Sequence, residues 1–80
     1  MLQPDSIQHG IESGMACQSV IVTGDGEHFE ATVVSAAFVG KSSIQRHQLV
    51  YQALGDRMKQ EIHALSIKTY TPEQWAEGRA

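Results

Sequence analysis

Four histidines and one cysteine are the side chains of this sequence best suited to bind a metal ion. His28 lies in a polar, glycine-containing stretch, whereas His63 immediately precedes an apolar run. Neutral imidazole is a common ligand of zinc, copper and iron. A lone histidine is more often a structural residue, so a metal site here requires a fold that brings these side chains together.

Three stretches of the sequence are typical of β-strands. Residues Ser19 to Thr23 are apolar and β-branched at their centre, and Phe29 to Ala36 form a second such stretch. The turn signal Gly24-Asp25-Gly26 lies between them, so the two stretches predict an antiparallel hairpin. The third predicted strand runs from His63 to Tyr70.

Helices are predicted near both ends of the chain. Residues Pro4 to Glu12 place apolar side chains on one face, and Gly14 is predicted to end this helix. Near the other end, Thr71 is a predicted N-cap, Pro72 takes the first turn, and the glutamine three residues after Thr71 can complete a capping box. Trp75 would then pack this short helix against the rest of the fold.

A longer helix is predicted after Phe38-Val39-Gly40, with Ser42 or Ser43 as its N-cap. Gly55 is expected to divide it into a longer and a shorter part. One side of the helix is expected to be buried because it carries Ile44, His47, Val50, Tyr51, Leu54 and Met58. His47 is therefore interpreted as a structural histidine of the core.

The predicted order is α-β-β-α-α-β-α, an α+β fold with a mixed three-stranded sheet. A helical crossover joins the second and third strands, which predicts that they run parallel if they are neighbours. His28 and His63 lie at the starts of these two strands, so both imidazoles are expected at one end of the sheet. Two histidines are too few for a closed metal site, so any metal would need ligands from a second molecule.

The sequence shows no self-contained enzyme. Cys17 is expected at the opposite end of the sheet and is interpreted as a small apolar filler. No Gly-x-Ser-x-Gly elbow occurs, and the Gly24-x-Gly26 pair lacks the rest of a dinucleotide fingerprint. Asp25 and Glu27 are interpreted as solvated loop carboxylates.

Composition limits the remaining classes of function. The 80 residues carry a formal net charge of −3, and they predict one domain over residues 1–80. A single cysteine and the lack of a secretory or membrane-spanning pattern predict a cytoplasmic protein. The acidic balance disfavours nucleic-acid binding, for which Lys41, Arg46 and Lys68 are the candidate contacts.

Two long runs of the sequence resemble the BolA family. The first extends from Phe38 through Gly40 and the pair Arg46-His47 to Tyr51. The second extends from Ile62 to Trp75 and contains His-Ala-Leu-Ser-Ile followed by Thr-Pro-x-x-Trp. The resemblance covers nearly the whole chain in the right order, and it is closest to the short bacterial branch with a histidine in the hairpin loop.

The resemblance implies a fold related to class II KH domains and a role as a partner protein. BolA-like proteins pair with monothiol glutaredoxins of the CGFS type and share a bridging [2Fe–2S] cluster with them. The glutaredoxin supplies a cysteine and bound glutathione supplies its thiol. On the BolA side the implied ligand is His63, from the His-Ala-Leu-Ser-Ile element. The resemblance also implies a second ligand or near-ligand from the hairpin loop, a cysteine or a histidine depending on the branch, and here the candidate is His28.

The family is also associated with transcriptional regulation through DNA binding. The run Gly40-Lys41-Ser42-Ser43 lacks the second glycine of a G-x-x-G backbone clamp, so this sequence gives the alternative limited support. Salt dependence of DNA retention would distinguish specific binding from background. The sequence is also compatible with a homodimer.

Overall fold

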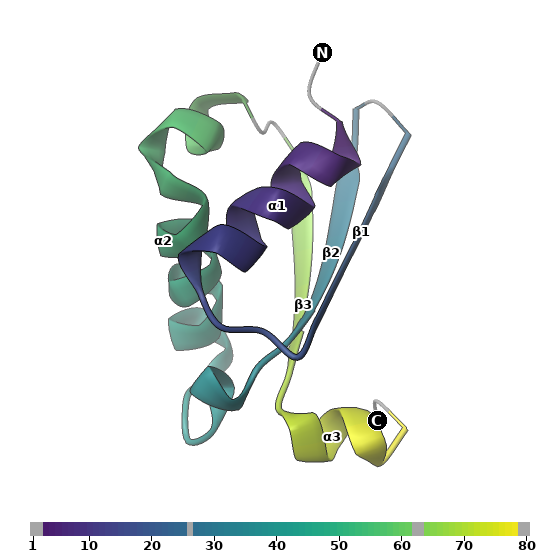
Figure 1. The fold of residues 1–80 in the computed structure, drawn as a ribbon, viewed down its shortest axis with the longest axis vertical. Coiled ribbons are helices and arrows are strands. Elements are labelled where there is room, and N and C mark those ends of the chain that lie inside the picture. Colours follow the sequence, from purple (N-terminus) through teal and green to yellow (C-terminus); the bar gives the residue numbers. More distant parts are fainter. Residues whose placement is uncertain (1–2, 26, 62–63, 79–80) are drawn as a thin grey trace.

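A computed structural model shows three helices, a short 3₁₀ helix and three strands (Figure 1). It describes residues 3–25, 27–61 and 64–78, with the backbone alone for residues 56–61. No helix within these ranges is long and apolar enough to cross a membrane. The elements are α1 (Pro4–Gly14), β1 (Ser19–Gly24), β2 (Phe29–Val34), η1 (Ala36–Phe38), α2 (Ser43–Glu61), β3 (Leu65–Tyr70) and α3 (Pro72–Ala76).

The three strands form one mixed sheet in the order β1-β2-β3. β1 and β2 pair antiparallel, so that Ser19 lies opposite Val34. β2 and β3 pair parallel, and Phe29 lies opposite Leu65. The predicted hairpin and the predicted parallel pair are therefore both confirmed, with α2 in the crossover between β2 and β3.

Helices α1 and α2 lie over the same face of the sheet (Figure 1). Alternate residues of each strand point toward them because successive side chains of a strand face opposite ways. The side chains that meet in this core are Ile7, Ile11, Val20, Val22, Phe29, Ala31, Val33, Phe38, Val50 and Leu54. Neither α1 nor α2 covers the other face of the sheet.

At Gly14 the end of α1 packs closely against the backbone of α2. A Cβ added at Gly14 would collide with the backbone of Ala53 in α2. Gly14 is the last residue of α1 and Met15 is the C-cap, so the predicted helix end is close to the observed one. The structure adds a second reason for glycine at this position, because any side chain would force the helices apart.

The helix α2 is interrupted at Gly55, as predicted, because this residue has φ 80° and ψ 165°. At its start, Ser42 and Gln45 exchange reciprocal hydrogen bonds that cap the helix. The prediction that Ile44 is buried is wrong, because its side chain is exposed in the first turn of α2. His47, interpreted as a histidine of the core, is half-buried. Met58, expected on the same side, belongs to the segment whose side chains are not described.

The second and third strands are shorter than predicted. β2 ends at Val34 because Ser35 leaves the strand and caps η1: its Oγ accepts from Ala37 N–H at 3.1 Å. The same hydroxyl donates to the carbonyl of Ala16 at 2.7 Å, which joins the end of β2 to the segment before β1. β3 begins at Leu65, and His63, the predicted first residue, lies outside the described residues.

The predicted capping box of α3 is confirmed. Thr71 Oγ1 accepts from Gln74 N–H at 3.1 Å, and Gln74 Oε1 accepts from Thr71 N–H at 2.9 Å. Pro72 occupies the first helical position. Trp75 packs against Tyr70 with ring centroids 5.5 Å apart, so it joins α3 to the end of β3 as predicted.

Candidate functional site

The loop between β1 and β2 is held by the carboxylate of Asp25. Asp25 Oδ1 accepts hydrogen bonds from the backbone N–H groups of His28 and Glu27, at 2.9 and 3.0 Å. These bonds favour the ionised form and lower the pKa of Asp25. Asp25 is exposed, as predicted, but it also fixes the backbone that carries His28, whose side chain is exposed. Gly26, the third residue of the predicted turn, lies outside the described residues.

The hairpin end of the sheet is also where β3 begins. Phe29 N–H donates to the carbonyl of Ala64 at 2.8 Å, one residue before the pairing of Phe29 with Leu65. His28 immediately precedes Phe29, and His63 immediately precedes Ala64 in the sequence. The starts of the two strands thus share one end of the sheet, whereas the place of the His63 side chain stays a prediction. No group of three His, Cys, Asp or Glu side chains able to hold a metal occurs among the side chains described, those of residues 3–25, 27–55 and 64–78.

Cys17 lies at the other end of the sheet. It precedes the start of β1, whereas the hairpin follows the end of β1. Its half-buried side chain packs against the core, with Sγ 3.6 Å from the carbonyl oxygen of Met15. Burial, with a smaller contribution from the charge of Glu12, raises the pKa of the Cys17 thiol. These observations agree with its interpretation as an apolar filler.

The three candidate nucleic-acid contacts belong to two surfaces. Lys41 and Arg46 lie together at the start of α2, where Arg46 Nε donates to the carbonyl of Lys41 at 3.0 Å. Arg46 also reaches α3, since its Nη1 donates to Gln74 Oε1 at 3.0 Å. Lys68 lies on the uncovered face of β3, 3.9 Å from the Glu30 carboxylate. These three candidate contacts therefore do not form one continuous patch.

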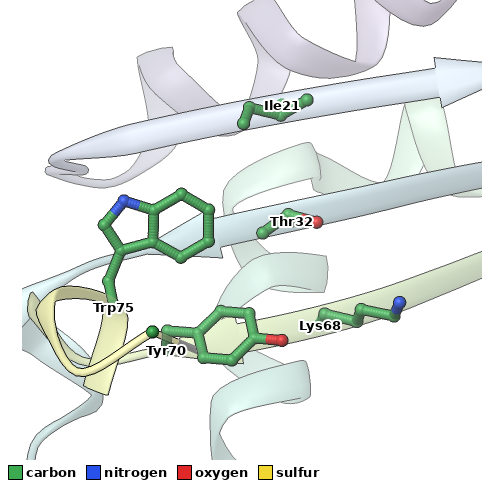
Figure 2. Close-up of a pocket in the computed structure, with 6 residues that line it drawn as sticks. Ile21, Thr32, Lys68, Tyr70 and Trp75 are labelled. Carbon is green, nitrogen blue, oxygen red and sulfur yellow. The ribbon is translucent and has the colours of Figure 1, made fainter. Parts of the chain in front are cut away.

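A shallow groove of about 480 Å³ lies on the uncovered face of the sheet. Figure 2 shows Ile21, Thr32 and Lys68 in a row across the three strands, with Tyr70 and Trp75 beside them. The row follows from the register, because Ile21 pairs with Thr32 and Thr32 pairs with Lys68. Gly78 completes the lining. The sequence interpretation missed this groove, although the outward residues of three paired strands could have indicated its floor.

The family model of BolA-like proteins matches residues 2–74. The chain belongs to the BolA family. Acid stress protein IbaG of Escherichia coli K12 is 38% identical to it over 79 residues, covering 98% of this chain and 94% of IbaG. The expected relationship to the short bacterial branch is thereby confirmed.

Two further members support this assignment. A BolA homologue from Coxiella burnetii has a solved structure that is 47% identical and superposes with a TM-score of 0.84, covering 95% of this chain and 99% of that one. The Vibrio cholerae protein named DNA-binding transcriptional regulator BolA is 46% identical over 54 residues, which are 68% of this chain and 51% of that protein. The BolA-like α+β fold is thus established from both sequence and structure.

Proposed function

We propose that this BolA-family chain is a non-enzymatic partner of a monothiol glutaredoxin and shares a bridging [2Fe–2S] cluster with it. The observation that carries the proposal is the hydrogen bond between Phe29 and Ala64, because it joins the starts of β2 and β3. These two residues are the immediate sequence neighbours of His28 and His63. The exposed side chain of His28 is accessible to a partner at this end of the sheet.

The number of ligands explains why a partner is needed. A [2Fe–2S] cluster takes four external ligands. His28 and His63 offer two imidazoles, so the glutaredoxin cysteine and the glutathione thiol would complete the set. Histidine ligation on one iron raises the reduction potential relative to four cysteines and makes ligation sensitive to protonation. Such a shared cluster suits transfer or sensing in iron–sulfur trafficking, iron homeostasis or the response to stress.

The Asp25 turn supports a role for His28 in this site. The carboxylate accepts hydrogen bonds from the N–H groups of Glu27 and His28, so the backbone of these two residues is held in place before a partner binds. A ligand on an ordered backbone loses less conformational entropy when it binds than one on a mobile loop. His63 is assigned the principal ligand role by its position in the His-Ala-Leu-Ser-Ile element of the family.

Reconstitution with a CGFS glutaredoxin, glutathione and an iron–sulfur source tests the proposal. Visible circular dichroism would be recorded for the wild type, His63→Ala and His28→Ala. His9→Ala is the matched control because it removes an exposed imidazole from α1. We expect His63→Ala to abolish the spectrum of the mixed complex, His28→Ala to weaken it, and the control to leave it unchanged.

Each outcome of this reconstitution has a defined meaning. A mixed-complex spectrum unchanged in His63→Ala contradicts the proposal. Loss of the mixed-complex spectrum in His63→Ala alone would assign His63 as a ligand and show that His28 does not bind the cluster. Thermal unfolding of each variant, without partner or cluster, separates loss of ligation from loss of fold.

DNA binding is the second candidate function, favoured by the name of the Vibrio cholerae relative. The charges of this chain give it less support, because Lys68 is beside Glu30 and the guanidinium of Arg46 is hydrogen bonded within the protein. We expect duplex DNA to be released at moderate salt without sequence preference. Preferential binding of one DNA sequence over others at physiological salt would favour a function as a DNA-binding regulator instead.

A further inference from the structure

Two large aliphatic side chains are exposed at the turn that leads from η1 into α2. Ile44 is 72% exposed and Val39 is 64% exposed, both more than Ile21 on the open sheet face at 47%. Residues 39–46 are called the η1–α2 corner below. Single exposed apolar residues are common, but apolar side chains gathered at one site are typical of interaction surfaces.

The η1–α2 corner is held in place by its own hydrogen bonds. Lys41 N–H donates to the carbonyl of Phe38 at 3.1 Å, and Phe38 is fully buried in the core. Gly40 allows the turn because its φ of 76° is one that other residues rarely adopt. Arg46 fixes the same turn from α2 through its bond to the Lys41 carbonyl. The exposed side chains are therefore displayed on an ordered backbone, which lowers the entropic cost of binding.

The charge at the η1–α2 corner is opposite to that of the whole chain. Residues 31–55 contain Lys41 and Arg46 but no Asp or Glu, although the chain carries a net charge of −3. Within the described part of the structure, neither Lys41 nor Arg46 forms an ion pair. This surface therefore attracts acidic groups, whereas the rest of the molecule on average repels them.

We propose that the η1–α2 corner docks an acidic polypeptide segment that carries aliphatic side chains. Burial of Val39 and Ile44 requires an apolar partner surface. Lys41 favours a partner segment whose carboxylates lie next to its aliphatic side chains. Nucleic acid fits these groups less well, because phosphates would leave both aliphatic side chains in water. High-affinity DNA binding also needs several phosphate contacts, and Lys68 lies on another surface.

The docking surface is separate from the proposed cluster site. β2 begins at Phe29 beside the hairpin and ends at Val34, just before η1. Figure 1 accordingly places the hairpin and the turn before α2 at opposite ends of the molecule. The surface does not depend on a cluster or on a glutaredoxin, so either proposal can fail without the other.

Selection from a phage-displayed library of random peptides tests this proposal. Peptides would be selected on the wild type, and the affinities of the enriched sequences measured for the double variant Val39→Thr, Ile44→Gln and for Lys41→Glu. Both changes in the double variant keep the local backbone preference, since Gln favours helix and Thr tolerates an extended conformation. Ile21→Thr is the matched control because it removes an exposed isoleucine from the open sheet face.

We expect enriched peptides that combine Asp or Glu with aliphatic residues. Their affinity should fall about tenfold or more in the double variant and in Lys41→Glu, and stay unchanged in the control. The proposal is overturned if no enriched peptide depends on Val39 and Ile44, or if the dependent peptides are not acidic. A short DNA duplex that binds more tightly than the peptides, with a dependence on Lys41 alone, would also overturn it. Circular dichroism and thermal unfolding establish that each variant is folded.

Discussion

At the scale of single residues, Gly14 shows how one missing side chain sets the distance between two helices. The change Gly14→Ala would force a methyl group against the Ala53 backbone, which cannot rotate away as a side chain could. We expect a loss of about 1–3 kcal/mol in the free energy of unfolding, measured by urea denaturation. Ser13→Ala is the control, because Ser13 is exposed in the same helical turn. Equal stability of Gly14→Ala and the wild type would show that α1 can shift without cost.

Asp25 predicts a pH dependence of the hairpin loop. Its pKa is lowered from 3.8 by the bonds from the His28 and Glu27 N–H groups, so the folded turn favours the carboxylate. The stabilisation is therefore present above about pH 3.8 and is lost as the pH falls through the lowered pKa. We expect the amide resonances of Glu27 and His28 to titrate together with a midpoint below 3.8, as measured by NMR.

Substitution of the same residue separates charge from hydrogen bonding. Asp25→Asn keeps an oxygen acceptor but does not titrate, so its loop should remain ordered in acid. Asp25→Ala should disorder the loop at every pH, because both N–H groups lose their acceptor. A midpoint above 3.8 in the wild type would contradict the assigned cause of the pKa shift.

At the scale of elements, Arg46 joins the start of α2 to the capping box of α3. Its Nη1 shares the acceptor Gln74 Oε1 with the N–H of Thr71. Gln74→Ala should therefore cost about 1 kcal/mol through the cap, and the Arg46–Gln74 pair should add a coupling of about 0.5–1 kcal/mol. A double-mutant cycle with Arg46→Ala measures this coupling, and Trp75 fluorescence reports the position of α3.

The lysine variant tests the geometry of this bridge. Arg46→Lys keeps the positive charge but cannot donate to both the Lys41 carbonyl and Gln74 with a planar fork. We expect it to lose most of the coupling to Gln74. Coupling that survives in Arg46→Lys would show that the interaction is mainly electrostatic.

The elements were predictable wherever a local pattern decides them. The hairpin, the break at Gly55 and the capping box at Thr71 follow from glycine, proline and capping chemistry within a few residues. Ile44 shows where a helical wheel fails, because the wheel gives the face of a residue but not whether the sheet extends beneath that turn. The sequence likewise could not show that the Ser35 hydroxyl joins the end of β2 to the segment before β1, since its acceptor, the Ala16 carbonyl, is 19 residues away.

At the scale of the whole molecule, the parallel pairing of β2 and β3 makes the candidate site. His28 and His63 are 35 positions apart in the sequence, and only a crossover connection returns the chain to the same end of the sheet. Topology therefore predicted that these two histidines lie at the same end of the sheet, while the full ligand set rested on the family resemblance. The groove on the open face depends on where α3 and the residues after it place Trp75 and Gly78, which no local pattern specifies.

The same topology predicts that the cluster site and the η1–α2 corner bind their partners independently of each other. β2 spans six residues, so at about 3.3 Å per residue the hairpin and the η1–α2 corner are about 20 Å apart. Sites at such a separation without shared contacts show little coupling.

We expect the double variant Val39→Thr, Ile44→Gln to change the affinity for the glutaredoxin complex by less than about twofold. His28→Ala should likewise leave the affinity for a selected peptide unchanged, and size-exclusion chromatography should show one ternary complex. Competition between the peptide and the glutaredoxin would contradict this arrangement, because it would mean that both occupy one end of the sheet.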